Sequence, residues 1–208
     1  FPIQSSTRCP ISSAAQAYSF NVTGIPPGSL GCLTLWPQGQ AQPNIVTLDD
    51  ITGDIRNNAA IVPAGTPNGG ISAVVNGNTD LVIDINGYYA PPGPGGLSLY
   101  NLAPCRVLDT RLPAGSLPFR GSRDVNVVGS PCNVPASAQA YIFSATVVPP
   151  GPLGFLTLWP QGQPLPLAAT LNASDGAVTN NMAIIGTTNG AVSAFATDLT
   201  HLVLDIFG

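Results

Sequence analysis

The chain has 208 residues, only 8% of them are charged, and the formal net charge at pH 7 is -4. This acidic balance, together with the absence of any run of Arg residues, argues against a nucleic-acid partner, because phosphate binding needs clustered basic side chains. No segment reaches the roughly 18 consecutive apolar residues of a membrane-spanning helix, so we expect no membrane span.

The residue types favour strands and turns over helices. All six basic residues are Arg and all ten acidic residues are Asp, so the strong helix formers Lys and Glu are absent. Gly (23 residues) and Pro (22 residues) are abundant, and Val, Ile and Thr recur throughout. We therefore expect an all-β chain. A surface with so little charge also predicts either covalently attached glycans or burial in a polymer.

The octapeptide LTLWPQGQ occurs twice, at residues 33–40 and, unchanged, at residues 156–163. The same offset of 123 residues places Cys9 on Cys132, and both Trp residues of the chain lie in the octapeptide. Self-similarity over such a length indicates that one module has been duplicated.

The two copies are expected to cover residues 1–89 and 97–208, separated by a Pro- and Gly-rich linker at residues 90–96. Within them, apolar or alternating stretches are bounded by Gly, Pro or Asn at intervals of about ten residues, a spacing typical of a β-sandwich or barrel. We therefore predict two tandem modules that are β-sandwich-like or barrel-like. The expected strands lie at residues 17–23, 33–36, 45–48, 57–62, 71–75 and 80–85, with counterparts that include 140–147 and 199–206.

The second copy begins with a segment that the first copy lacks. Residues 97–111, LSLYNLAPCRVLDTR, predict a leading strand, and a loop rich in Gly, Pro and Arg follows as far as residue 123. The first copy begins where its version of this segment would end. We therefore expect the first copy to be a β module without its leading strand.

Three motifs resemble those of a known family: APCRVLDTR at residues 103–111, GFLTLWPQGQ at residues 154–163 and DLVIDINGYY at residues 80–89. Similar tandem β-domains occur in secreted and cell-surface proteins of environmental bacteria. A looser resemblance is to subunits of extracellular bacterial fibrils. The family resemblance covers nearly the whole chain, except for the missing leading strand of the first copy and the end at Gly208. It implies an extracellular or cell-surface structural role and brings no catalytic residues.

Four cysteines in a secreted-looking β protein predict two disulfides. Cys105 and Cys132 both belong to the complete second copy, so we expect them to pair. Cys9, the counterpart of Cys132, has no counterpart of Cys105 beside it, but Cys32 stands where the second copy has Phe155. We therefore expect Cys9–Cys32 as the second bridge. Metal ligation is the rival interpretation, disfavoured because the chain has neither a CxxC motif nor a His cluster.

A β module without its first strand leaves an open edge and an uncovered apolar groove, both of which invite an added strand. We therefore expect identical subunits to assemble head-to-tail, and such contacts build a filament because they do not close. Residues 1–5 and the segment 97–111 are the candidate donors, with the apolar members Phe1, Pro2, Ile3, Leu99, Tyr100, Leu102, Val107 and Leu108. The other interpretation is a fragment of a longer tandem array whose missing strand was not included.

Several single residues are candidate binding or modification sites. Asn21 in NVT and Asn172 in NAS match the N-glycosylation pattern, although either could be an ordinary strand or turn residue. Trp36 and Trp159 are candidates for stacking on a sugar, with a core position as the alternative. Asp49 and its neighbours in one Gly-containing loop could hold Ca²⁺, but turn-forming Asp residues explain the same pattern.

No catalytic constellation is visible. There is no nucleophile motif, and the aligned residues Asp84 and Asp205 belong to separate copies, so they do not form the carboxylate pair of a glycosidase. We expect no enzymatic activity and no cofactor. The sequence predicts a structural subunit of an extracellular fibre or pilus-like filament. The alternative is a carbohydrate- or cell-wall-binding module of a larger secreted protein.

Overall fold

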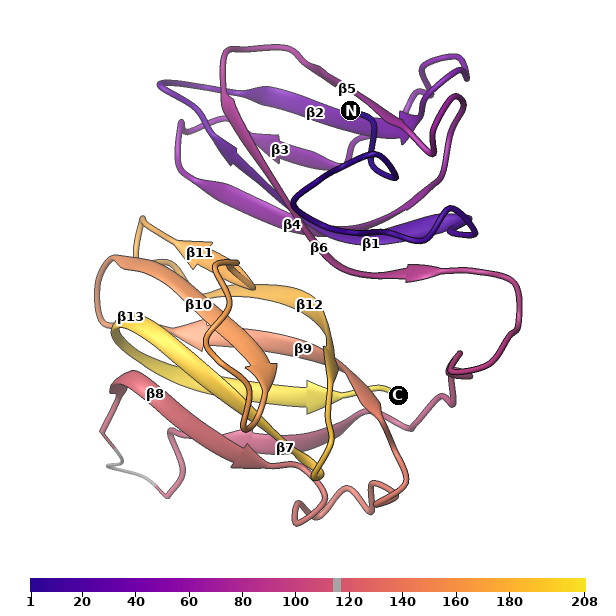
Figure 1. Cartoon of the computed structure of the whole chain (residues 1–208). Helices are drawn as coiled ribbons and strands as arrows, with labels where there is room; N and C mark the ends of the chain where they lie inside the picture. Colours follow the sequence, from indigo (N-terminus) through magenta and orange to yellow (C-terminus); the bar gives the residue numbers. More distant parts are fainter. Residues whose placement is uncertain (114–116) are drawn as a thin grey trace. The chain divides into compact units, whose positions relative to one another are not determined.

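The computed structural model describes residues 1–113 and 117–208, and these residues form strands, turns and loops without any helix (Figure 1). The predicted all-β class is confirmed. In the described part of the chain nothing has the length and apolar character of a membrane-crossing helix. The strands are β1 Ala17–Ile25, β2 Gly31–Pro37, β3 Leu48–Asp50, β4 Arg56–Pro63, β5 Ile71–Val75, β6 Asp80–Tyr89, β7 Cys105–Asp109, β8 Phe119–Asn126, β9 Ala140–Val148, β10 Leu153–Pro160, β11 Leu171–Ala173, β12 Thr179–Gly186 and β13 Ala191–Ile206.

The chain divides into two compact units, Phe1–Gly96 and Leu97–Gly208, which we call module 1 and module 2. The division falls at the end of the Pro- and Gly-rich linker, where a segment with few apolar side chains has little to bury. Each module has its own hydrophobic core.

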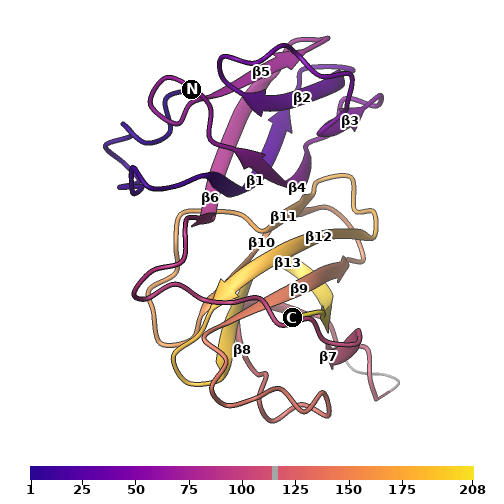
Figure 2. The same ribbon diagram turned by 90° about the vertical axis from the view of Figure 1, so that its right-hand side faces the viewer.

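Module 1 is a sandwich of two antiparallel three-stranded sheets, with strand orders β4-β1-β6 and β3-β2-β5 (Figure 2). Its core contains side chains from both sheets, because alternate residues of each strand point inward. Tyr18 and Phe20 of β1, Leu33 of β2 and Ile71 of β5 are all at most 1% exposed.

Module 2 repeats this strand order and adds two strands. β12-β9-β13 corresponds to β4-β1-β6, and β11-β10-β13 corresponds to β3-β2-β5. The long strand β13 takes part in both halves: its first part pairs with β10 and β8, and its second part pairs with β9 and β7. In module 1 the counterparts of the two parts of β13 are separate strands, β5 and β6, with residues 76–79 between them. Among the described residues, module 1 has no counterpart of β7, and residues 1–3 align with residues 124–126 at the end of β8.

Three expectations about the strands need correction. Residues 119–123, expected as the end of a loop, lie in β8, because pairing with β13 outweighs the weak strand propensity of Gly, Ser and Arg. The strand expected at residues 45–48 begins only at Leu48, as β3. The carbonyl of Ile45 accepts a hydrogen bond from the side-chain hydroxyl of Thr34 instead of one from a backbone N–H of a neighbouring strand. The leading strand is shorter than expected and begins only at Cys105.

Candidate functional site: the open edge of module 1

In module 2, β7 covers the outer edge of the second part of β13. Leu108 lies opposite Leu204, Arg106 opposite Asp205 and Cys105 opposite Ile206. The side chains of Leu202, Leu204 and Ile206 are 0% exposed. Leu102, Val107 and Leu108 pack against the same core from the outside. β7 therefore closes this edge of the module.

A disulfide fixes the beginning of β7. Cys105 and Cys132 are bonded, with 5.6 Å between their Cα atoms, so the predicted pairing of these two residues is confirmed. The bridge closes a loop with a sequence separation of 27. By the chain-entropy relation, a loop of this length stabilises the module by about 3.5 kcal/mol.

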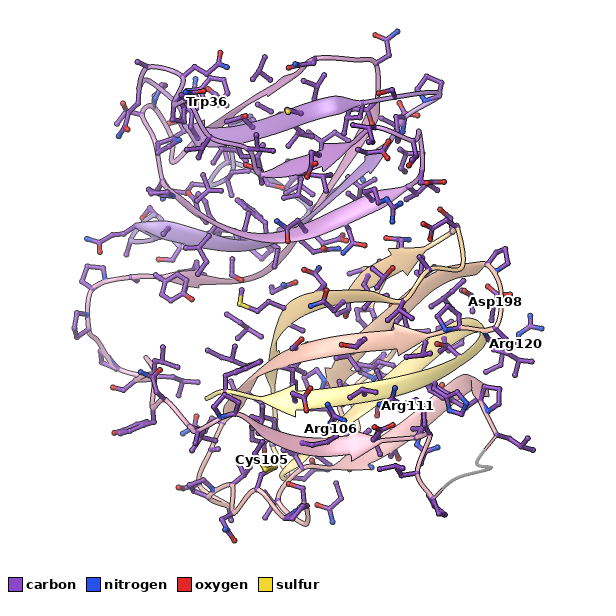
Figure 3. The ribbon with its side chains drawn as sticks, turned by 180° about the vertical axis from the view of Figure 1, so that it is seen from behind. Trp36, Cys105, Arg106, Arg111, Arg120 and Asp198 are labelled. Carbon is purple, nitrogen blue, oxygen red and sulfur yellow. A yellow bond between two sulfur atoms is a disulfide. The ribbon has the colours of Figure 1, made fainter. Side chains whose placement is uncertain are left out.

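Charged side chains fix the remainder of β7 (Figure 3). Arg106 donates to both carboxylate oxygens of Asp205, at 2.9 and 3.2 Å, and to Asp109 at 3.1 Å. Arg111 donates two further bonds to Asp109, at 2.8 and 2.6 Å. Hydrogen bonds from Arg111 lower the pKa of Asp109 to about 2. This network joins the end of β7 to β13 through charge-assisted bonds.

Module 1 has the same edge, and no strand of the described residues covers it. The register between β6 and β1 matches that between β13 and β9, since Ile85 faces Phe20 as Ile206 faces Phe143. Among the described residues, however, β6 pairs with β1 alone and forms the edge of its sheet. Ile85, the counterpart of the fully buried Ile206, is only partly buried.

A groove of about 470 Å³ lies along this edge. Its lining consists of Phe20, Ile83 and Ile85 from the sheet β4-β1-β6 and of residues 1–3 and 5–9 from the N-terminal segment, which add both apolar and polar side chains. An unpaired strand edge beside an apolar groove is the arrangement that accepts an added β-strand. This groove is the candidate functional site.

The candidate donor residues occupy three different places. Phe1, Pro2 and Ile3 form a wall of the groove, held by two backbone hydrogen bonds between Phe1 and Ile71. Val107 and Leu108 lie in β7, and Leu102 is bonded through its N–H to the carbonyl of Phe207. Leu99 and Tyr100 are 64% and 78% exposed, outside either core. Residues 1–3 therefore already contact the groove of their own module.

The predicted Cys9–Cys32 bridge is wrong, because the structure has both residues as free thiols. Cys32 lies in β2 opposite Asp49, in the sheet that does not contain β6. Cys9 lines the groove. Cys9, which aligns with Cys132 in the sequence, thus lies in the groove beside β6, an edge that no described strand covers. The alignment of Cys9 with Cys132 is the sequence signal for this position.

The two glycosylation candidates differ in accessibility. Asn21 is 1% exposed in β1, which speaks against a glycan on this side chain in the folded chain. Asn172 is less buried, and its amide donates a hydrogen bond to the carbonyl of Gly154 at 2.8 Å. Glycosylation of Asn172 stays a prediction.

The two Trp residues chiefly close the turns of the repeated octapeptide. The indole N–H of Trp36 donates to the carbonyl of Gln40, and that of Trp159 donates to the carbonyl of Gln163. Trp159 is only 7% exposed, so little of its ring is available for stacking. Trp36 lines a second groove of about 280 Å³ and stays a candidate for sugar stacking (Figure 3).

The acidic loop of module 1 uses its carboxylates to shape the turn. Asp50 accepts hydrogen bonds from Thr52 and from the backbone N–H of Gly53. Asp54 accepts a hydrogen bond from Thr52 and one from Arg56. Within residues 1–113 and 117–208, no three His, Cys, Asp or Glu residues are grouped as metal ligands.

Comparisons of the chain with protein-family models, with curated proteins and with solved structures found no match. Module 2 is therefore the reference with which module 1 can be compared.

Proposed function

We propose that this chain is a structural subunit of an extracellular fibre or pilus-like filament whose subunits join head-to-tail by strand complementation. The observation that carries the proposal is the open edge of β6. In module 2 the matching edge, in the same register, is covered by β7. In the fibre, a strand from a neighbouring copy covers the edge of module 1.

Burial of the groove in module 1 offsets the exposure that results when β7 leaves module 2. A covering strand would bury the rest of Leu81, Ile83 and Ile85, which are only partly buried. Each of these side chains gains about 1 kcal/mol on full burial. Because ordering a free segment costs about 2–5 kcal/mol, the donor must bring apolar residues of its own. Val107 and Leu108 do this in module 2.

The segment 97–111 is the donor that fits this edge. Its β7 portion already sits on the matching edge of module 2, whereas residues 1–3 form a wall of the acceptor groove. Transfer of β7 to a neighbouring copy uncovers module 2 as it covers module 1. The exchange is therefore nearly neutral in buried area and depends on protein concentration, as domain swapping does.

Three further features support the setting. A disulfide in module 2 is compatible with an oxidising compartment outside the cytoplasm. The sparse charge of the chain suits a surface that is buried in a polymer or covered by glycans. The resemblance of the sequence motifs to secreted and surface β-repeats, and more loosely to fibril subunits, points to the same role.

A self-complemented variant tests the proposal. A second copy of residues 97–123 is placed directly before Phe1, in the register that the repeat dictates, so that module 1 receives a leading segment of its own. Electron microscopy should show filaments of the natural chain at high concentration and only monomers of this variant. In the control variant, Val107→Asp and Leu108→Asp in the added segment restore filaments. The proposal is overturned if the natural chain stays monomeric or if the self-complemented variant still forms filaments.

A carbohydrate- or cell-wall-binding module is the second candidate, and the groove beside Trp36 favours it. Pro43, Ile45 and Ile61 join Trp36 in lining this groove, and an indole beside apolar walls suits the face of a sugar ring. Titration with soluble polysaccharides should then change the Trp fluorescence and release heat. The signal should vanish in Trp36→Ala and persist in Trp159→Phe. A signal unaffected by Trp36→Ala would remove this candidate.

A further inference from the structure

We propose that Cys9 is a covalent acceptor, whose thiol captures Cys105 of a second copy when the β7 segment of that copy adds to β6. This inference rests on the proposed function, since it requires the groove to receive a strand. It goes further by naming the bond that locks the strand in place. The occupant is residues 102–110 of the second copy.

The register places the two sulfur atoms together. In module 2, Cys105 lies opposite Ile206 and is bonded to Cys132. In module 1, Ile85 corresponds to Ile206 and Cys9 corresponds to Cys132. Ile85 and Cys9 line the same groove. A strand that adds to β6 in the register of β7 therefore brings its cysteine opposite Ile85, beside Cys9.

A matching acidic residue supports the same register. Arg106 forms a two-pronged ion pair with Asp205 across the β7–β13 edge. Asp84 holds the position of Asp205 in β6, between Ile83 and Ile85. An incoming β7 segment thus brings Arg106 to an aspartate one residue away from the position where Cys105 meets Cys9.

The other free thiol provides a matched comparison within the same module. Cys32 is partly exposed, like Cys9. It lies in β2, whose edges are paired with β3 and β5, and it does not line the groove. Its counterpart, Phe155, is in ring contact with Phe195, with centroids 6.0 Å apart. Reagents can therefore reach the Cys32 thiol, but no unpaired strand edge lies beside it to bind an added strand.

Thiol–disulfide exchange accomplishes the capture without an outside oxidant. The Cys9 thiol loses its proton, and the thiolate attacks Sγ of Cys105 in the disulfide of the second copy. The Cys9–Cys105 bond forms as the Cys105–Cys132 bond breaks. Cys132 leaves as a thiolate and takes up a proton. One disulfide and one thiol are present before and after the step, so the covalent bond moves together with the strand.

A peptide probe tests the inference on the whole chain. The probe is a synthetic peptide of residues 101–111 whose cysteine carries thionitrobenzoate as a mixed disulfide. Attack by a protein thiol releases the coloured thionitrobenzoate and leaves the peptide attached. We expect one peptide per chain, mapped to Cys9, at a rate at least about 50-fold above that of Cys32, because binding raises the local concentration of the probe. Cys9→Ser should abolish the fast uptake, and Cys32→Ser should not.

Control peptides and the filament decide between the outcomes. A scrambled peptide that reacts with Cys9 equally fast would overturn the inference, because the thiol would then be merely accessible. So would filaments whose non-reducing peptide map contains no Cys9–Cys105 link. If a labelled peptide with Ser in place of the cysteine binds and filaments form, only the covalent step fails. If that peptide does not bind and filaments are absent, the proposed function fails as well.

Discussion

Truncation of one isoleucine in each module measures whether the edge of module 1 is open in solution. Ile85 and Ile206 occupy the same position on the same strand edge, opposite Phe20 and Phe143. They differ in the strand that covers them: Ile206 is 0% exposed under β7, and Ile85 is partly exposed beside the groove. Ile85→Ala and Ile206→Ala are therefore a chemically identical pair in two settings.

The expected losses of unfolding free energy differ about twofold. Removing the buried side-chain atoms of Ile206 forfeits about 2.4 kcal/mol of transfer free energy, and the cavity that remains raises the loss to about 3.5–4 kcal/mol. Ile85→Ala should cost only about 1.5–2 kcal/mol, because part of the side chain is already in water and the open groove leaves no closed cavity. With the self-complementing segment before Phe1, the loss for Ile85→Ala should rise towards that for Ile206→Ala.

The octapeptide provides the assay, since it places one Trp in each module. Urea unfolding followed by Trp fluorescence reports module 1 in a Trp159→Phe background and module 2 in a Trp36→Phe background. Equal losses for the two substitutions, within about 0.5 kcal/mol, would refute the reasoning. Such equality would mean that another part of the chain covers the groove in solution.

Two predictions concern the disulfide and the ion pairs that hold β7 in place. Cys132→Ser should lower the unfolding free energy of module 2 by about 3.5 kcal/mol and leave that of module 1 unchanged. Urea titrations with and without reductant measure this difference, and an equal loss in both modules would contradict the prediction. The carboxyl of Asp109 has a pKa of about 2 in the folded chain, below the ordinary 3.8. The ionised carboxyl stabilises folded module 2 by about 1–2 kcal/mol, less than the pKa shift alone implies, because both Arg partners are partly exposed to solvent. This stabilisation is complete above about pH 5 and is lost as the pH falls towards 2. Asp109→Asn should flatten this part of the stability–pH curve of module 2, and an unchanged slope would contradict the role of Arg111.

The internal repeat made much of the fold predictable. Aligning the two octapeptides located β1, β2, β4, β5 and β6 within a few residues, because these strands have apolar alternation and clear turn residues at their ends. β8 escaped prediction because its strand character comes from pairing with β13, and nothing local in residues 119–126 indicates it. The continuity of β13 through both halves of module 2 is likewise a tertiary property.

The candidate site was predictable in outline and wrong in one detail. The leading segment that precedes the second copy alone in this sequence indicates an edge strand in the first copy, and among the described residues β6 forms that edge beside Ile83 and Ile85. The expected Cys9–Cys32 bridge assumed that every cysteine pairs within its own module. Sequence offsets do not reveal that Cys32 belongs to the other sheet.

Among the described residues, β7 is present in module 2 alone, and this bears on how many strands an assembly needs. Within residues 1–113 and 117–208 there are two matching edges, on β6 and β13, and one strand of the β7 pattern to cover them. Counting these residues alone, each subunit offers one such strand for two edges, so one edge per subunit is left for a strand from elsewhere. Exchange of β7 segments between subunits changes which edges are uncovered along a fibre but not how many. Each subunit of a fibre would thus retain one edge that can accept a further strand. Covering every edge of the fibre would take more than one β7-like strand per chain.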